Sequence, residues 1–275
     1  MNIAVCFKTI ADYGPLGEQD WATDDRLRID LSLARREFNC YDESALELAL
    51  QLAEAQRRGG AGCELTALTV DGPRADIFLG RLLAAQYDRG VRIDADEEMD
   101  LRFNPSAVSL LISAFVQRIG GQQLLLLGTQ GGSGENGQTG FLVAERLGWP
   151  CIRKVSDVRP GRRSGTIQVI SRREEAMLEQ TVALPAVLTI GNAESAPYLR
   201  VPTLKQRIAV RGTPIKVLSL AQLGLPAAQI SAANPSLQRL FRPPPRGGCM
   251  FIDTPHPRDS ARRLYQRYLA GRMVK

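Results

Sequence analysis

Residues 128–140 read GTQGGSGENGQTG, a run in which six of thirteen residues are glycine. Glycine has no Cβ, so its backbone can approach a ligand closely and can take φ > 0. The run lies between an apolar stretch at 122–127 and an amphipathic one at 140–149, which predicts a loop from a strand to a helix. The N–H groups of such a loop and the positive end of the helix favour an anion such as phosphate.

Neutral polar side chains in this run can add hydrogen bonds to a ligand; among them are Ser133, Asn136, Gln138 and Thr139. Glu135 would repel a phosphate, and we expect it either to hold a ribose hydroxyl or to face solvent. The chemistry predicted for the run is therefore noncovalent binding of a phosphate-bearing ligand.

Two other interpretations of the run stay open. The first is a flexible surface loop. The second is the dinucleotide fingerprint G-x-G-x-x-G, which Gly132, Gly134 and Gly137 match, with Asp157 lying 20 residues beyond Gly137. That match would indicate an NAD-dependent dehydrogenase, although its first glycine comes several residues after the predicted end of the strand. A kinase-type P-loop is excluded because no G-K-[ST] follows.

Few side chains elsewhere suit acid–base or nucleophilic catalysis. His256 is the only histidine, so neither a Ser-His-Asp triad nor a histidine-rich metal site is predicted. The five cysteines are scattered without a C-x-x-C, which indicates a reducing compartment rather than a disulfide framework or a zinc site. They are Cys6, Cys40, Cys63, Cys151 and Cys249. We predict no catalytic residue and no metal ligand, and expect no substrate chemistry by the chain's own side chains.

The composition is that of an ordinary globular protein. The 275 residues are 44% hydrophobic, which is enough to bury a large core. The net charge of +6 is mild, and no helix-turn-helix, zinc spacing or aromatic RNA-binding motif accompanies it, so nucleic-acid binding is not predicted. No basic leader and no run of about 18 apolar residues is present. We expect a cytoplasmic protein without a membrane span.

Strands and helices alternate through about residue 150, which predicts a doubly wound, mostly parallel α/β sheet. The predicted strands are 2–7, 64–70, 91–94 and 122–127, with further extended pieces at 151–158, 166–173 and 185–191 and a half-exposed hairpin strand at 25–33. The predicted helices are 39–60, with Asp42 or Ser44 as the cap, 75–86, 104–121 and 140–147. Ligands of such sheets bind outside the carboxyl ends of the strands, where the glycine run would lie.

The character of the chain changes beyond about residue 200. Residues 225–257 hold seven of the 16 prolines, which indicates an extended arm. From 235 to 275 there are nine Lys or Arg and two Asp. A solvated basic face and a partner-docking arm both fit this segment. Docking fits better because the terminal helix has an apolar stripe, formed by Ala261, Leu264, Tyr265, Tyr268 and Leu269.

The glycine run and several other motifs resemble the β subunit of electron transfer flavoproteins. In and after the run, the family's G-x-Q, Q-T/V-G and L-G-W-P are matched by residues 128–130, 138–140 and 147–150. Further matches lie in order along the chain: Lys8 with Asp12-Tyr13, Asn39 to Glu43, Thr69 to Pro73, Asp88 to Val91, and Leu184 to Val187. Together these motifs cover about residues 1–220.

The resemblance implies a fold, partners and cofactors. It implies a Rossmann-like nucleotide-binding domain at 1–205 and an extended arm with a terminal helix at 206–275 that docks on an α subunit. The heterodimer would carry electrons from a dehydrogenase to an acceptor through FAD held mainly by the α subunit. The β chain would bind AMP, or a second FAD in its place. The chain would thus be an electron-carrier subunit rather than an enzyme acting on its own substrate.

Carried over by motif, the nucleotide contacts come from four separate segments. They are Cys6, Asn39, Cys40, Tyr41, Asp42, Asp71, Gly128, Thr129, Gln130, Gly131, Gly132, Ser133, Gly134, Glu135, Asn136, Gly137, Gln138 and Thr139. In the run, Gly134 resembles the FAD-type members and Thr139 the AMP-type members, so both nucleotides stay open.

The resemblance also places a dehydrogenase-docking loop at 191–199. Common members have an apolar leucine where this chain has Glu194. Burying a leucine stabilises a complex by roughly 1.5–3 kcal/mol, which a carboxylate cannot supply, so we expect a partner other than the usual dehydrogenase. A nucleotide-binding or sensing module without redox work is the alternative that this change suggests.

Overall fold

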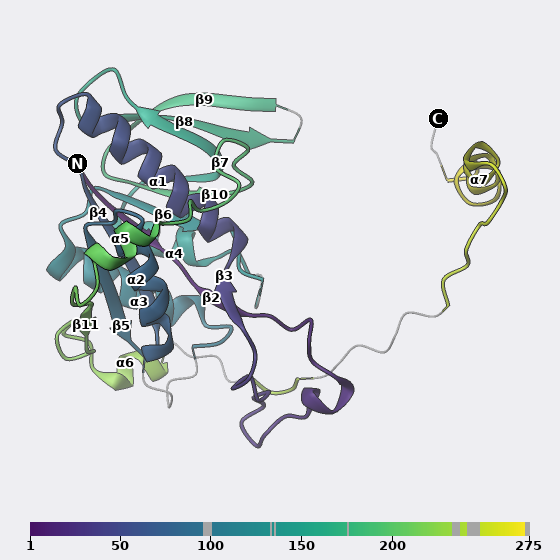
Figure 1. Ribbon diagram of the computed structural model, residues 1–275, viewed down its shortest axis with the longest axis horizontal. Coiled ribbons are helices and arrows are strands. Elements are labelled where there is room, and N and C mark those ends of the chain that lie inside the picture. Colours follow the sequence, from purple (N-terminus) through teal and green to yellow (C-terminus); the bar gives the residue numbers. More distant parts are fainter. Residues whose placement is uncertain are drawn as a thin grey trace. The chain divides into compact units, whose positions relative to one another are not determined.

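The computed structural model describes residues 1–95, 101–132, 134, 136–174, 176–232, 237–240 and 248–272. The chain divides into two compact units, Met1–Ser236 and Leu237–Lys275. The first unit contains a nine-stranded sheet with helices on both faces (Figure 1). The described part of the second unit contains α7 (Pro257–Leu264), which continues as the π-helix η4 (Tyr265–Leu269). In the described part of the chain, no helix is long and apolar enough to cross a bilayer.

The order of the strands across the sheet is β11-β5-β4-β1-β6-β10-β7-β8-β9. All neighbours from β11 to β7 pair in parallel, whereas β7, β8 and β9 form an antiparallel extension. The strands are β1 (Asn2–Cys6), β4 (Glu64–Asp71), β5 (Arg89–Asp94), β6 (Leu124–Gly128), β7 (Cys151–Pro160), β8 (Thr166–Arg173), β9 (Ala176–Ala183), β10 (Ala186–Ile190) and β11 (Lys216–Leu218). The predicted mostly parallel, doubly wound α/β fold is confirmed.

The central strands are apolar on both faces because helices cover both. In β6, Leu124 and Leu126 join one core cluster, while Leu125 and Leu127 join the cluster on the opposite face. The first face is covered by α1 (Cys40–Arg58) and α2 (Asp76–Ala84), which follows the 3-10 turn η2 (Pro73–Ala75). The second face is covered by α3 (Pro105–Phe115), its π-helical extension η3 (Val116–Gly120), and α4 (Thr139–Leu147). Such runs of leucine are typical of buried parallel strands.

Local signals explain where several helices begin and end. Asn104 accepts the N–H of Ala107 at 3.0 Å, and Pro105 follows it at the first helical position, so α3 begins as predicted. Gly148, with φ of 67°, ends α4. For α1 the cap prediction was wrong, because the helix starts one turn earlier, after Asn39.

The predicted hairpin strand at 25–33 was also wrong. This segment has only an isolated bridge between Thr23 and Ile29. Aspartates just before and within it bond to nearby backbone instead: Asp24 accepts the N–H groups of Arg26 and Arg28 at 2.9 and 2.7 Å, and Asp30 accepts that of Ser32 at 2.9 Å. Such local side-chain bonds compete with a strand ladder. The hairpin that does form pairs β2 (Thr9–Ala11) with β3 (Arg36–Phe38), and the 3-10 turn η1 (Glu18–Trp21) lies in the excursion between them.

Residues beyond 200 contribute to the first unit. After α5 (Leu204–Ala209), β11 adds a strand beside β5. Leu223, Leu225 and Ile230, the last in α6 (Ala227–Ala232), are buried in the same core cluster as α3. The division between the units therefore falls at residues 236 and 237, and part of the segment predicted as arm packs on the sheet.

Candidate functional site

The strand order reverses at β1, so that β4 and β5 lie on one side of it and β6 and β10 on the other. A crevice at such a switch point, outside the carboxyl ends of the strands, is the usual ligand site of an open α/β sheet. A cavity of about 900 Å³ occupies this place. The ends of β1, β4 and β6, the start of α4 and the excursion between β2 and β3 line it.

Asp42, in the first turn of α1, joins the ends of the two central strands. Its Oδ1 accepts the N–H of Gly128 at 2.8 Å, and its Oδ2 accepts the N–H of Lys8 at 2.9 Å. The side chain is buried, and burial raises the pKa of the carboxyl to about 6, although these two backbone N–H groups and neighbouring groups act in the opposite direction. Asp42 thus fixes the spacing of β1 and β6 at the mouth of the cavity.

Asn39, just before α1, holds the glycine run. Its Nδ2 donates to the carbonyl of Gln130 at 2.9 Å, and its Oδ1 accepts the N–H of Gly132 at 3.2 Å. Asn39 is buried, where water cannot satisfy its amide, and these two hydrogen bonds satisfy both the oxygen and the nitrogen. The first part of the run is therefore attached to α1 rather than free on the surface.

Asp71 closes the cavity at the end of β4. Its Oδ2 accepts a hydrogen bond from Thr9 Oγ1 at 2.9 Å and lies 3.4 Å from Arg36 Nη2, while its Oδ1 accepts the N–H of Gly72 at 2.8 Å. The Nε of Arg36 is buried and has no hydrogen-bond partner among the described residues. Because Arg36 lines the cavity, its guanidinium suits an anionic ligand there.

Three glycines allow the close approach on which this arrangement depends. A Cβ at Gly128 would clash with the Asp42 carboxylate, and one at Gly140 would clash with the Thr189 side chain. Gly137 has φ of +61°, and a Cβ there would lie 3.2 Å from the carbonyl oxygen of Thr129. Glycine is therefore required at these positions for packing. It also leaves the backbone of the run accessible to a ligand.

The structure brings most of the sequence-predicted site residues to this one cavity. Those that line it are Cys6, Asn39, Asp42, Asp71, Gly128, Thr129, Gln130, Gly131, Asn136, Gly137, Gln138 and Thr139. Cys40, Tyr41 and Gly132 instead line a neighbouring cavity of about 550 Å³, which shares Asn39, Gln130 and Gly131 with the first. Gly134 lies against Phe103, which lines the larger cavity. Ser133 and Glu135 lie outside the described residues.

Sequence reasoning missed Thr9, Arg36 and Phe103 as cavity residues. No local signal marks Thr9 or Arg36, because they reach the cavity through the β2–β3 hairpin, which was not predicted. Phe103 directly precedes the correctly predicted helix start at Asn104-Pro105. The residue before a helix that follows a parallel strand lies at the carboxyl edge of the sheet, so this position could have been found.

Asp157, the acidic partner of the dinucleotide fingerprint, lies elsewhere. It is in β7, where its Oδ2 is 2.6 Å from Arg159 Nη2 and its Oδ1 accepts the N–H of Val158 at 2.9 Å. It is not among the described residues that line the cavity. The carboxylate is thus engaged away from the site, and its position gives no support to a ribose contact of the NAD type.

Cys6 lines the cavity as a packing residue rather than a reactive thiol. It is buried, and burial, followed by the charge of Asp42, raises the pKa of its thiol far above the ordinary value. Burial likewise raises the pKa of Cys151 to about 11. Both thiols therefore stay protonated near neutral pH, and the thiolate is the form that reacts.

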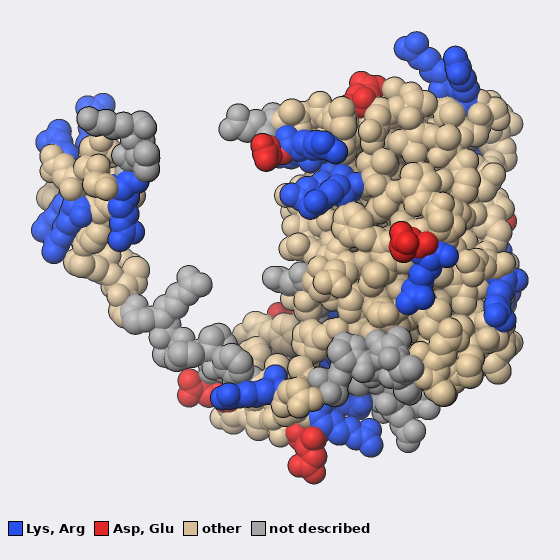
Figure 2. All heavy atoms as spheres, turned by 180° about the vertical axis from the view of Figure 1, so that it is seen from behind, with Lys and Arg blue, Asp and Glu red and all other residues tan. Residues whose placement is uncertain are grey.

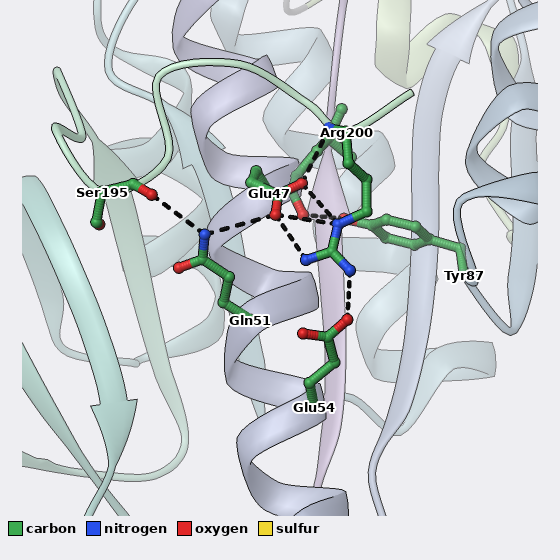
Figure 3. A network of polar contacts seen from close by, with 7 residues as sticks. Glu47, Gln51, Glu54, Tyr87, Ser195 and Arg200 are labelled. Atoms are coloured by element: carbon green, nitrogen blue, oxygen red, sulfur yellow. Dashed lines mark hydrogen bonds and ion pairs between the residues drawn. The ribbon is translucent and has the colours of Figure 1, made fainter. Parts of the chain in front are cut away.

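The middle of α1 holds the loop that follows β10 (Figure 3). Both carboxylate oxygens of Glu47 accept from Arg200 Nε at 3.0 Å, and Arg200 Nη1 pairs with Glu54. The N–H of Arg200 donates to Glu47 at 3.1 Å, and Gln51 donates to the carbonyl of Ser195 at 3.2 Å. One helix therefore positions both the cavity and residues 195–200.

Comparison with known proteins shows which family the chain resembles. The electron transfer flavoprotein domain model matches residues 30–223. The chain is 32% identical to the putative electron transfer flavoprotein subunit YgcR of Escherichia coli (strain K12), with 99% of both chains covered. It is 26% identical to the electron transfer flavoprotein subunit beta of Mycobacterium tuberculosis (strain ATCC 25618 / H37Rv), over 94% of this chain and 90% of that one. It is also 27% identical to the acryloyl-CoA reductase electron transfer subunit gamma of Anaerotignum propionicum, over 92% and 93%.

Proposed function

Because the chain belongs to the electron transfer flavoprotein family and has a role of that type, we propose that it is the β-type subunit of an electron carrier. In this proposal it forms a heterodimer with an α-type subunit, and the complex passes electrons from a dehydrogenase to an acceptor. Flavin, bound mainly by the α-type subunit, supplies the ability to accept and release electrons. In this proposal, the residues of the β chain bind, orient and enclose a nucleotide.

The observation that carries the proposal is the meeting of three separate segments at one cavity. The start of α1, the end of β4 and the glycine run all line it. An adenine nucleotide fits these residues for two reasons. The glycines leave backbone open to phosphate, and the Arg36 side chain, which lines the cavity and is 31% exposed, presents a guanidinium that can pair with an anion. The nucleotide is AMP, or a second FAD in its place.

Within this cavity we assign separate roles to the polar groups. The N–H groups of Thr129, Gly132 and Gln138 already donate to Ile190, Asn39 and Asn136. Other backbone N–H groups of the run, such as those of Gln130, Gly131 and Gly137, would hold the phosphates together with Arg36. Asn39 and Asp42 would act through the backbone, because their side-chain atoms are already bonded to the run, to Gly128 and to Lys8. They keep the loop in the form that accepts the nucleotide, so ligand binding needs little reorganisation.

The second unit would dock on the α-type subunit. Its helix leaves large apolar side chains exposed, with Leu264, Tyr265 and Leu269 each at least 40% exposed. Figure 2 shows Lys and Arg gathered around this helix, and its arginines include Arg262 and Arg263. Apolar side chains beside guanidinium groups suit a groove with an apolar floor and an acidic rim.

A dehydrogenase would dock near 191–199. This segment is attached to α1 through Arg200 and Gln51, so its backbone is presented in a defined position. Glu194 is exposed on it. A partner with a cationic or polar patch would therefore fit better than one with an apolar socket.

The proposal is tested by co-expressing the chain with candidate α-type subunits. We expect a stable complex with the absorption spectrum of bound flavin, which dithionite bleaches and an added acceptor restores. A pure complex without flavin, or no complex, contradicts the proposal. A complex whose flavin is reduced but never reoxidised by any acceptor supports a nucleotide-binding or sensing module instead.

A further inference from the structure

We infer that Phe103 is the platform on which the planar ring of the bound nucleotide stacks. The inference rests on the proposed nucleotide binding and assigns the ring, adenine or isoalloxazine, to a defined part of the cavity. Phe103 lies between the end of β5 and Asn104, the cap of α3. Nothing in the phosphate-binding role of the glycine run requires an aromatic residue at this position.

The exposure of Phe103 is unusual for a phenylalanine in a pocket wall. The side chain lines the larger cavity and is 45% exposed. One edge of the ring faces the glycine run, because a Cβ at Gly134 would lie 3.4 Å from Cδ1 of Phe103. Phe103 lines the cavity and is only partly covered, and an accessible aromatic ring in a pocket wall is a surface on which a heteroaromatic ring can stack.

The backbone of Phe103 supports this reading. Its φ is 54°, in the left-handed region that bulky residues rarely adopt. Leu27, which lies in the excursion between β2 and β3, has φ of 55°. Residues held in this region are concentrated at ligand sites, where the surrounding structure maintains the conformation. Phe103 and Leu27 belong to the two segments that meet at the cavity, whereas the other described non-glycine residues with positive φ, which are Gln86, Lys154 and Glu174, are not among the residues that line it.

Arg102 joins these two segments. Its Nη1 donates to the carbonyl of Leu27 at 2.8 Å, and its Nη2 donates to the carbonyl of Arg26 at 3.0 Å. The contact holds the excursion over the start of α3, so that Ile29 and Leu31 line the same cavity as Phe103. Arg102 therefore acts as a positioning residue for the part of the excursion that lines the cavity.

The lining of the cavity includes apolar side chains besides Phe103 as well as the polar glycine run. Val70, Leu101 and Val108 line it and are only partly buried against the core. A ligand that combines a flat, weakly polar ring with phosphate matches this mixed lining. The ring would remove the apolar surface from water, which favours binding, while the phosphates remain at the N–H groups.

The test uses the heterodimer formed with the α-type subunit, stripped of the β-site nucleotide and titrated separately with AMP and with FAD by calorimetry. Stacking on an aromatic ring contributes about 1–3 kcal/mol, which corresponds to roughly 5- to 150-fold in Kd. Phe103→Leu keeps the apolar volume and should weaken binding by this factor. Phe103→Tyr keeps the ring and should stay within about threefold of the wild type.

Phe141→Leu is the matched control, because Phe141 is 42% exposed and lies outside the described lining of the cavity. Thermal unfolding of the ligand-free proteins separates a stacking role from a structural role of Phe103. The Tm of Phe103→Leu should stay within about 2 °C of the wild-type Tm, which is a smaller shift than a defect in the core would cause. The inference is overturned if Phe103→Leu binds like the wild type, if Phe103→Tyr fails to retain affinity, or if Phe141→Leu loses as much. A wild-type complex that binds neither nucleotide overturns the nucleotide proposal as well.

Discussion

At the scale of single residues, Asp42 and Asn39 position the backbone that we propose binds the nucleotide. Asp42 ties Gly128 to Lys8, and Asn39 ties Gln130 to Gly132. Each side chain uses both of its polar ends, so neither can be replaced without leaving a backbone group unpaired. Such buried groups are expensive to leave unsatisfied, at roughly 1–3 kcal/mol each.

Because the carboxyl of Asp42 is buried, we predict an unusual pH dependence of the free energy of unfolding. Because burial raises its pKa from 3.8 to about 6, the folded protein binds this proton more tightly than the unfolded chain. Its contribution to stability is therefore full below about pH 4 and is lost as the pH rises through about 6. Between pH 5 and 7.5, the free energy of unfolding of the wild type minus that of Asp42→Asn should fall by roughly 1–1.5 kcal/mol. Urea titrations at each pH measure it, and a difference that rises with pH would contradict the account.

We predict that replacing Gly137 by valine causes loss of the bound nucleotide. Gly137→Val introduces a side chain at φ of +61° beside the carbonyl of Thr129, which displaces the run. The bound nucleotide should then be largely lost, because each 1.4 kcal/mol of lost interaction raises Kd about tenfold. Mass spectrometry of heat-released nucleotide measures this loss. Gly60→Val is the control, because Gly60 also has positive φ but no atom within 4 Å of its Cβ position. Unchanged nucleotide in Gly137→Val, or equal loss in both variants, would show that the run does not hold the ligand.

At the scale of elements, α1 connects two functions. Its first turn positions the strand ends, and its middle holds residues 195–200 through the Glu47–Arg200 contact (Figure 3). The side chain of Glu47 is 9% exposed and that of Arg200 is 34% exposed. Removing the arginine would therefore leave a mostly buried carboxylate without its main partner.

Arg200→Ala should lower the free energy of unfolding by about 2 kcal/mol, less than for a fully buried pair because Arg200 is partly solvated. It should also speed amide hydrogen exchange in 191–203. Arg159→Ala is the control, since Arg159 is 66% exposed in its pair with Asp157 and should lose less than about 1 kcal/mol. Equal losses in the two variants, or unchanged exchange in 191–203, would mean that Arg200 does not hold the loop.

The elements that the sequence predicts well are those with local causes. Asn104-Pro105 starts α3, and four consecutive leucines form the central strand β6. The segment at 25–33 alternates like a strand, but Asp24 bonds to nearby backbone and prevents it. The strand β9 was missed because Met177 and Leu178, on an exposed edge, show no buried face.

The site is less predictable than its elements. Sequence motifs place Asn39 and the glycine run in it, but the bond between Asn39 and Gln130 joins residues 91 positions apart. Only the strand order brings them together. Thr9 and Arg36 reach the site through a hairpin whose pairing is set by contacts distant in sequence. No local sequence pattern could therefore predict them as site residues.

At the scale of the whole molecule, the two units predict separable roles. Met1–Ser236 contains both core clusters, whereas the described part of α7 and η4 has no buried residue. Deleting residues 237–275 should therefore leave the Tm of the isolated chain within about 2 °C, since little apolar surface is lost from the core. The same deletion should abolish co-purification with the α-type subunit. A truncated chain that unfolds, or that still binds its partner at full strength, would contradict this division.

We propose that this chain encloses an adenine nucleotide of its own, in addition to the flavin of its partner. Adenine can be counted in the purified heterodimer after acid hydrolysis and chromatography. We expect two adenines for each heterodimer, one from the flavin of the α-type subunit and one from AMP or FAD in the cavity at β1, β4 and β6. A single adenine, with all of it recovered as the FAD of the α-type subunit, would show that the cavity holds no nucleotide.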